Sequence, residues 1–165
     1  MKVSENNVAK KLRMASSGFT LIELMVTIAV LAIIVSIAAP NISAQLAQGQ
    51  IKATSTLIQT SVARAKAESS ILRSNVIWSY SNTDNRIVLS NLGKPIASYS
   101  LKDSSILSFN PTTATTLVIN KEGMITVAGN AANVTIDVSD SRISSSTQRV
   151  RINSKRAFEC SEANC

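Results

Sequence analysis

The sequence contains no histidine, only two cysteines and only five glycines among its 165 residues. Without histidine the chain lacks the commonest general base, the usual partner of a serine or cysteine nucleophile, and a frequent ligand of zinc and haem. Two cysteines cannot complete a four-ligand structural metal site, and no glycine-rich phosphate-binding pattern occurs. We therefore predict a protein that is not an enzyme, with no catalytic residue, metal, cofactor or small-molecule substrate.

Charge is scarce and unbalanced, with 17 Lys and Arg against 10 Asp and Glu and a formal net charge of +7. Such an excess is typical of proteins that meet nucleic acid or anionic membranes, and of targeting segments. The mean hydropathy is nevertheless positive, at +0.17. These averages indicate a very apolar segment joined to a polar domain.

The apolar segment is one run of 21 residues, Phe19–Ala39, which is followed by Pro40. As a helix it would be about 31 Å long, which matches a bilayer hydrocarbon core of about 30 Å. Residues 1–18 hold four basic residues and one acid, a net charge of 4 − 1 = +3. Because basic residues keep their end of a span in the cytoplasm, the rest of the chain is predicted to lie across the membrane. The polar members of the run are Thr20, Glu23, Thr27 and Ser36.

A cleaved secretory signal peptide is the alternative, with Ser36-Ile-Ala38 as a small-x-small cleavage site. The run exceeds the usual apolar region of a signal peptide, about 7–15 residues long, and it contains Glu23. A carboxylate at membrane depth costs roughly 2.5–3.5 kcal/mol on insertion scales, so it is normally retained for a partner. A membrane anchor is therefore favoured.

The stretch Gly18-Phe19-Thr-Leu-Ile-Glu23-Leu-Met-Val resembles the processing site of type IV pilins and type II secretion pseudopilins. The resemblance implies that a prepilin peptidase cuts between Gly18 and Phe19 and that the new amine of Phe19 is N-methylated. It assigns Glu23 to filament assembly and Pro40 to the bend of the family's helix. Pairing Glu23 with the terminal amine of a neighbouring subunit would offset the desolvation of both charges.

The helix is predicted to continue beyond the membrane as an amphipathic segment over residues 41–74, loosened at Pro40 and Gly49. Apolar or small residues recur there at steps of three to five, which predicts one face packed on a sheet. This stripe comprises Ile42, Leu46, Gly49, Ala53, Leu57, Ile58, Val62, Ala65 and Leu72.

Short runs rich in β-branched and aromatic residues follow, separated by turn residues. A long helix followed by antiparallel strands predicts an α+β fold. The expected strands are Val76–Tyr80, Arg86–Ser90, Ile96–Leu101, Ser105–Phe109, Thr115–Asn120, Met124–Ala128, Asn133–Ser139 and Gln148–Ile152.

Three features of this region resemble the minor pilin and pseudopilin H group (FimT, FimU and GspH types). They are Ile106-Leu-Ser-Phe109-Asn-Pro111, the glycine turn at Gly123, and Arg149-Val-Arg151 in the last expected strand. Gln148 stands where members usually have glycine before the Arg-x-Arg pair.

The two cysteines, Cys160 and Cys165, close the sequence. In the oxidising space outside the inner membrane we expect a disulfide between them that fixes the tail. Redox catalysis is not expected, because the spacing is not C-x-x-C.

A basic stretch without acids precedes these cysteines. Alternation places Arg149 and Arg151 on one face of a strand. In FimT-type pilins the equivalent region is linked to DNA binding, and such a cluster suits sequence-independent phosphate contacts. The alternatives, which we favour, are a solvated sheet edge that resists aggregation, or contact with acidic faces of neighbouring subunits. The stretch comprises Arg142, Arg149, Arg151, Lys155 and Arg156.

The sequence thus predicts a leader peptide (1–18), a transmembrane helix (19–40), an amphipathic continuation (41–74) and a β-rich head with a C-terminal disulfide loop (75–165). The first hypothesis is a minor pilin that primes or caps a type IV pilus, in twitching, adhesion or DNA uptake. The second is a type II secretion pseudopilin H, and the third a DNA-binding receptor at the pilus tip. The expected partners are the bacterial inner membrane, prepilin peptidase and other pilins, with a cytoplasmic N-terminus and a periplasmic head.

Overall fold

The computed structural model describes residues 19–160, apart from the side chains of residues 38–40 and 144. The chain divides into two compact units, Met1–Ala39 and Pro40–Cys165. One helix, α1 (Leu21–Leu72), has residues in both. It is long and apolar enough to cross a membrane by its length and composition.

In the first unit the described side chains are exposed throughout, from Phe19 to Ile37. Leu21, for example, is 77% exposed and Ile34 is 58% exposed. Apolar surface on this scale is not stable in water, so this part of α1 needs a lipid or protein environment.

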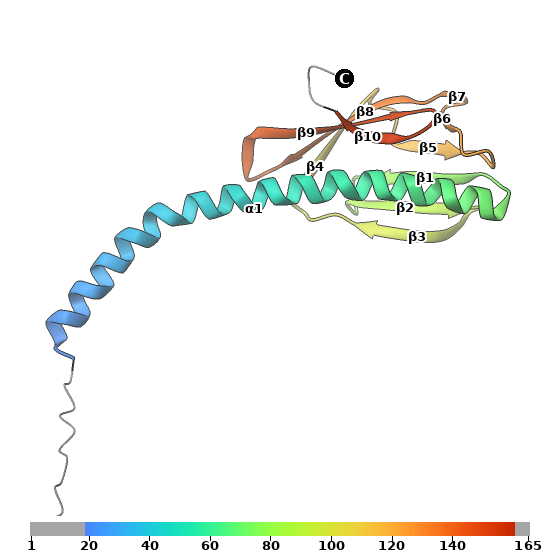
Figure 1. Ribbon diagram of the computed structural model, residues 1–165. Helices are drawn as coiled ribbons and strands as arrows, with labels where there is room; N and C mark the ends of the chain where they lie inside the picture. The colour runs from blue at the N-terminus through green and yellow to red at the C-terminus, as the bar shows by residue number, and fades with distance from the viewer. Residues whose placement is uncertain (1–18, 161–165) are drawn as a thin grey trace, which may run out of the picture. The chain divides into compact units, whose positions relative to one another are not determined.

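The second unit adds two antiparallel sheets to the remainder of α1 (Figure 1). The larger sheet has the strand order β3-β2-β1-β5-β6-β7, and the smaller sheet has the order β10-β9-β8-β4. The strands are β1 (Val76–Ser81), β2 (Arg86–Asn91), β3 (Lys94–Ser100), β4 (Ser105–Asn110), β5 (Thr116–Ile119), β6 (Ile125–Val127), β7 (Asn130–Ala131), β8 (Asn133–Asp140), β9 (Ile143–Asn153) and β10 (Ala157–Cys160).

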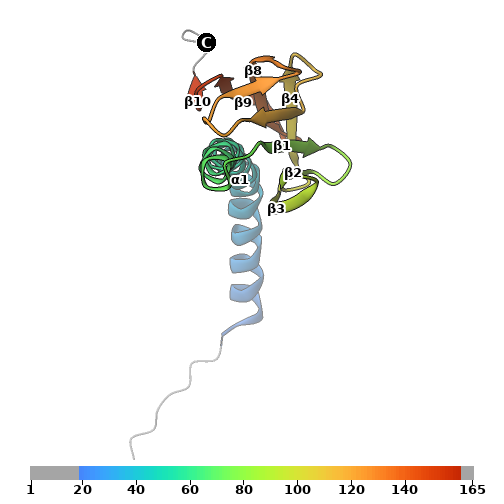
Figure 2. The same cartoon turned by 90° about the vertical axis from the view of Figure 1, so that its right-hand side faces the viewer.

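The core lies where the inner faces of both sheets meet one face of the second-unit part of α1, which is green and nearly end-on in Figure 2. Alternate residues of β1 and β8 are buried, as expected for strands with one covered face. Trp78 of β1 is fully buried, and its indole N–H donates to Ser61 Oγ of α1 at 2.7 Å. The α+β fold predicted from the sequence is confirmed.

The packed face of α1 differs from the predicted stripe. Ile58, Val62 and Ala65 are buried as expected, but Ile42 and Leu46 are 56% and 61% exposed. The face that contacts the sheets instead includes small hydroxyl residues, which allow close approach and bond locally, so hydropathy alone misplaced the stripe. Its buried members are Ala47, Ile51, Thr54, Ser55, Ile58, Ser61, Val62, Ala65 and Ser69.

All eight predicted strands are present, with ends that differ by a few residues, most of all at β9. The sequence prediction did not include β7 or β10. It also began β9 five residues late, at Gln148 instead of Ile143. β7 and β10 are very short and depend on their pairing with β6 and β9 rather than on their own composition.

Candidate assembly and binding surfaces

The predicted processing and assembly residues lie around the start of α1. Gly18 lies outside the described residues, as does the side chain of Pro40. Phe19 is 76% exposed and Glu23 is also exposed. The Glu23 N–H donates to Thr20 Oγ1 at 3.2 Å, so Thr20 caps the helix and Glu23 stands in its first turn. A carboxylate is favoured there by the helix dipole, a local role that the Thr-x-x-Glu spacing could have revealed.

The predicted basic pair lies on the outer face of the smaller sheet. Arg149 is paired with Asp137 of β8, with Nε 2.6 Å from Oδ1 and Nη2 3.3 Å from Oδ2. Arg151 donates from Nη2 to Asn133 Oδ1 at 3.1 Å. Asp137 therefore neutralises part of the positive charge that a phosphate backbone would need.

The sheet-edge interpretation of Arg149 and Arg151 is wrong. Both residues pair with β10, opposite Cys160 and Phe158 respectively, so the β9 edge is covered at these positions. The sequence prediction took β9 as the last strand because β10 has only four residues and no distinctive composition.

The remaining residues of the basic stretch, Arg142, Lys155 and Arg156, have different partners. Arg142 donates from Nε and Nη2 to the buried carboxylate of Asp140, both at 2.8 Å. These bonds hold the pKa of Asp140 well below its ordinary value, although burial opposes the shift. The backbone N–H groups of Lys155 and Arg156 donate to Asn153 Oδ1, and the Arg156 guanidinium lies 5.0 Å from the Phe158 ring centroid. The structure therefore does not gather the five predicted residues into one charged site.

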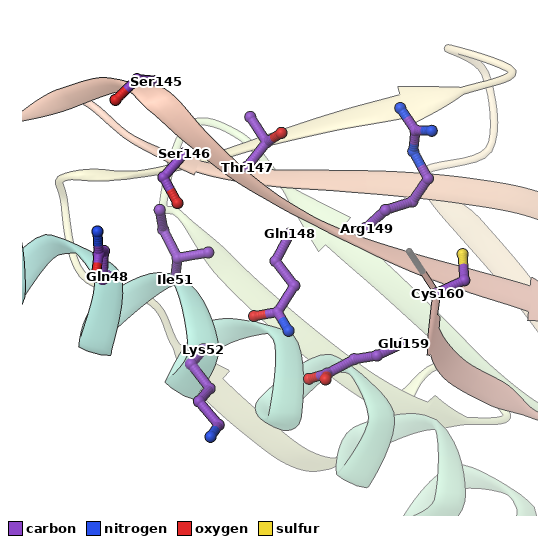
Figure 3. Close-up of a pocket in the computed structure, with 10 residues that line it drawn as sticks. All are labelled: Gln48, Ile51, Lys52, Ser145, Ser146, Thr147, Gln148, Arg149, Glu159 and Cys160. Atoms are coloured by element: carbon purple, nitrogen blue, oxygen red, sulfur yellow. The ribbon is translucent and has the colours of Figure 1, made fainter. Parts of the chain in front are cut away.

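A groove of about 690 Å³ lies between α1 and the first half of β9 (Figure 3). Ile51, 3% exposed, lies on its α1 side, and Gln148 points into it between Lys52 and Glu159. Glu159 accepts a hydrogen bond from Gln59 Nε2 at 3.1 Å. No local sequence pattern predicts this groove, since residues 48–52 of its lining lie far along the chain from residues 145–160. Its lining is Gln48, Ile51, Lys52, Ser145, Ser146, Thr147, Gln148, Arg149, Glu159 and Cys160.

Cys160, the last described residue, is disulfide-bonded. Cys165, its predicted partner, lies outside the described residues. Among the described residues, no group of three or more cysteine or carboxylate side chains is arranged to hold a metal ion.

Comparisons with known proteins match the chain both in sequence motif and in fold. Residues 13–39 match the prokaryotic N-terminal methylation motif. No curated protein sequence matches the chain.

Two crystal structures of the type IV minor pilin FimU from Pseudomonas aeruginosa are similar in fold, with TM-scores of 0.59 and 0.57 and 8% identity. The similarity covers 71% and 68% of this chain and 92% and 94% of theirs. The minor pseudopilin EpsH from the type 2 secretion system of Vibrio cholerae has a TM-score of 0.50 at 11% identity, over 68% of this chain and 97% of EpsH. The resemblance read from the sequence is confirmed: the chain joins a prepilin-type N-terminal methylation motif to the fold of minor pilins and pseudopilins.

Proposed function

We propose that the chain is a minor pilin, a non-catalytic subunit that primes or caps a type IV pilus. The observation that carries this proposal is the methylation motif of residues 13–39 in the same chain as a minor pilin fold. In this proposal the leader is residues 1–18, the membrane helix 19–40, its amphipathic continuation 41–74 and the head 75–165.

Processing cuts between Gly18 and Phe19 on the cytoplasmic face of the bacterial inner membrane, and Phe19 is then N-methylated. Glu23 pairs with the terminal amine of a neighbouring subunit, which offsets the desolvation of both groups. The exposed first unit supports an anchor that exchanges lipid contacts for subunit contacts.

A second surface for subunit contact is the α1 face that the sheets leave uncovered. Ile42 and Leu46 are more than half exposed, and Gly49 and Ala53 continue the same face. A shallow depression lies over Gly49, Ala53 and Leu57. Small residues beside large apolar ones suit close packing against another helix.

A type II secretion pseudopilin H is the second candidate, because the head fold is shared with EpsH. A deletion strain separates the two. Loss of twitching with normal protein export supports the pilus, and the reverse supports the secretion filament.

The Glu23→Ala variant tests assembly within that strain. It should insert in the membrane and be processed, yet be absent from purified filaments, because the partner charge is left unpaired. Thr27→Ala, a polar-to-alanine change one turn later, is the matched control and should assemble. Normal incorporation of Glu23→Ala contradicts the assembly role.

For the basic stretch we propose contact with a neighbouring subunit rather than DNA binding at the pilus tip, because Asp137 already pairs with Arg149. A mobility-shift titration of the processed chain against duplex DNA, at low and moderate salt, decides this point. A salt-sensitive shift that Arg149→Ala and Arg151→Ala remove would instead support the DNA receptor.

A further inference from the structure

On the side of β9 that faces β10, residues 143–148 have no strand beside them within the described part of the chain. There β10 pairs with β9 from Arg149 to Ile152, whereas β9 begins at Ile143. On the other side, β8 pairs Val138 with Gln148 and then Asp140 with Ile143. The register shifts between these two pairs, so residues 144–147 are skipped. Residues 144–147 therefore have no register partner among the described strands.

This stretch keeps the side-chain alternation of a strand. Ser146 and Gln148 point towards α1, whereas Thr147 and Arg149 point away from it (Figure 3). Ser145 and Thr147 are exposed, and Ser146 and Gln148 are half-buried. Its main chain is therefore shaped to pair with an added strand.

The edge also lacks the features that protect the outer edge of β3. β3, which ends the larger sheet, begins with Lys94-Pro95, a charge and a residue without an N–H. Residues 144–147 are Ser-Ser-Ser-Thr, with neither charge nor proline. Nothing in this composition discourages strand addition.

The groove supplies room beside this edge, in line with β10 beyond Cys160. Four residues at about 3.3 Å each present about 13 Å of edge, which a segment of four or five residues covers. The side chains around it are mainly hydroxyls and amides. Lys52 and Glu159 offset each other in charge, and Arg149 is paired with Asp137. The groove thus favours a segment with small, uncharged side chains.

We propose that this groove binds an extended peptide segment of a partner protein, which adds to β9 as a strand in line with β10. The segment's main-chain groups bond to residues 144–148, and its inward side chains lie against Ile51 and Gln148. That the partner is another filament subunit rests on the proposed function; the binding site itself does not.

The test uses the full chain in detergent micelles and a fluorescent probe, the acetylated and amidated peptide Thr-Val-Ser-Val-Thr. We expect saturable binding that protects the amides of residues 144–148 from hydrogen exchange. The same peptide N-methylated at alternate residues, which lacks main-chain donors, should bind at least tenfold more weakly.

Ser146→Trp fills the groove and should weaken binding at least tenfold. Thr135→Trp, on the outer face of the same sheet and outside the groove lining, is the matched control and should change binding less than twofold. If Ser146→Trp does not fold, the N-methylated peptide still decides the outcome.

The proposal is overturned if the wild-type chain does not bind the probe at millimolar concentration, or if both peptides bind equally. It is also overturned if only a chain ending at residue 160 binds, since the chain's own residues 161–165 would then be the occupant. These results concern the isolated chain, so they are independent of the deletion and filament experiments that test the proposed function.

Discussion

Replacing Ser61 with alanine removes the hydrogen-bond acceptor of Trp78, the only tryptophan in the chain. Both side chains are fully buried, and Ser61 Oγ also donates to the Ile58 carbonyl at 2.8 Å. The substitution leaves the indole N–H without its partner in the core, which costs about 1–3 kcal/mol. If the free energy of unfolding falls by about 2 kcal/mol for each molar of urea, the urea concentration at the unfolding midpoint should fall by about 1 M.

Ser55 provides the matched control on the same face of α1. It is equally buried, but its Oγ has no hydrogen-bond partner among the described residues. Ser55→Ala should therefore leave stability unchanged or raise it by up to about 1 kcal/mol, because a polar group is no longer buried unpaired. Urea unfolding followed by Trp78 fluorescence measures the stability of both variants. Equal losses in the two variants would refute the reasoning that the hydrogen bond, rather than serine packing, stabilises the core.

Three further substitutions test the head. Gly123 has φ +76°, and an added Cβ would lie 3.2 Å from Lys66 Cε; Gly123→Ala should cost about 1 kcal/mol or more in urea unfolding. Gly129→Ala, at φ +83° in open space, should cost less, and the reverse order would contradict the crowding argument. The depressed pKa of Asp140 means that its ionised form stabilises the fold above the ordinary carboxyl pKa, and that this stability is lost as pH falls. The wild-type melting temperature should therefore drop more than that of Asp140→Asn between about pH 5 and about pH 2; parallel curves would exclude the effect.

Much of the fold could be predicted because local patterns agree with tertiary burial. In β8, alternation from Val134 to Val138 matches the buried face, and the turn at Gly123 requires the left-handed backbone that glycine favours. The α1 face was misplaced because Ser61 and Ser55 read as polar, although serine packs closely in a helix interface. β10 escaped prediction because only its pairing with β9 makes its four residues a strand.

For the candidate surfaces, too, the sequence predicts what local patterns carry and misses what depends on tertiary contacts. Local sequence carries the methylation motif and the placement of Arg149 and Arg151 on one strand face. It does not show that Asp137 pairs with Arg149, because that contact depends on the β8–β9 register. The groove depends on how α1 lies beside β9 and β10, so no local pattern predicts it.

The N-terminus of the purified chain shows whether this protein is a processed filament subunit. The chain is expressed in a bacterium with prepilin peptidase and in a matched strain without it, and purified from membranes for intact-mass and fragment spectra. The account predicts a chain that begins at Phe19 with one added methyl group in the first strain, and an uncut chain in the second. A chain that begins at Met1 in both strains, or one cut after Ala38, would contradict it.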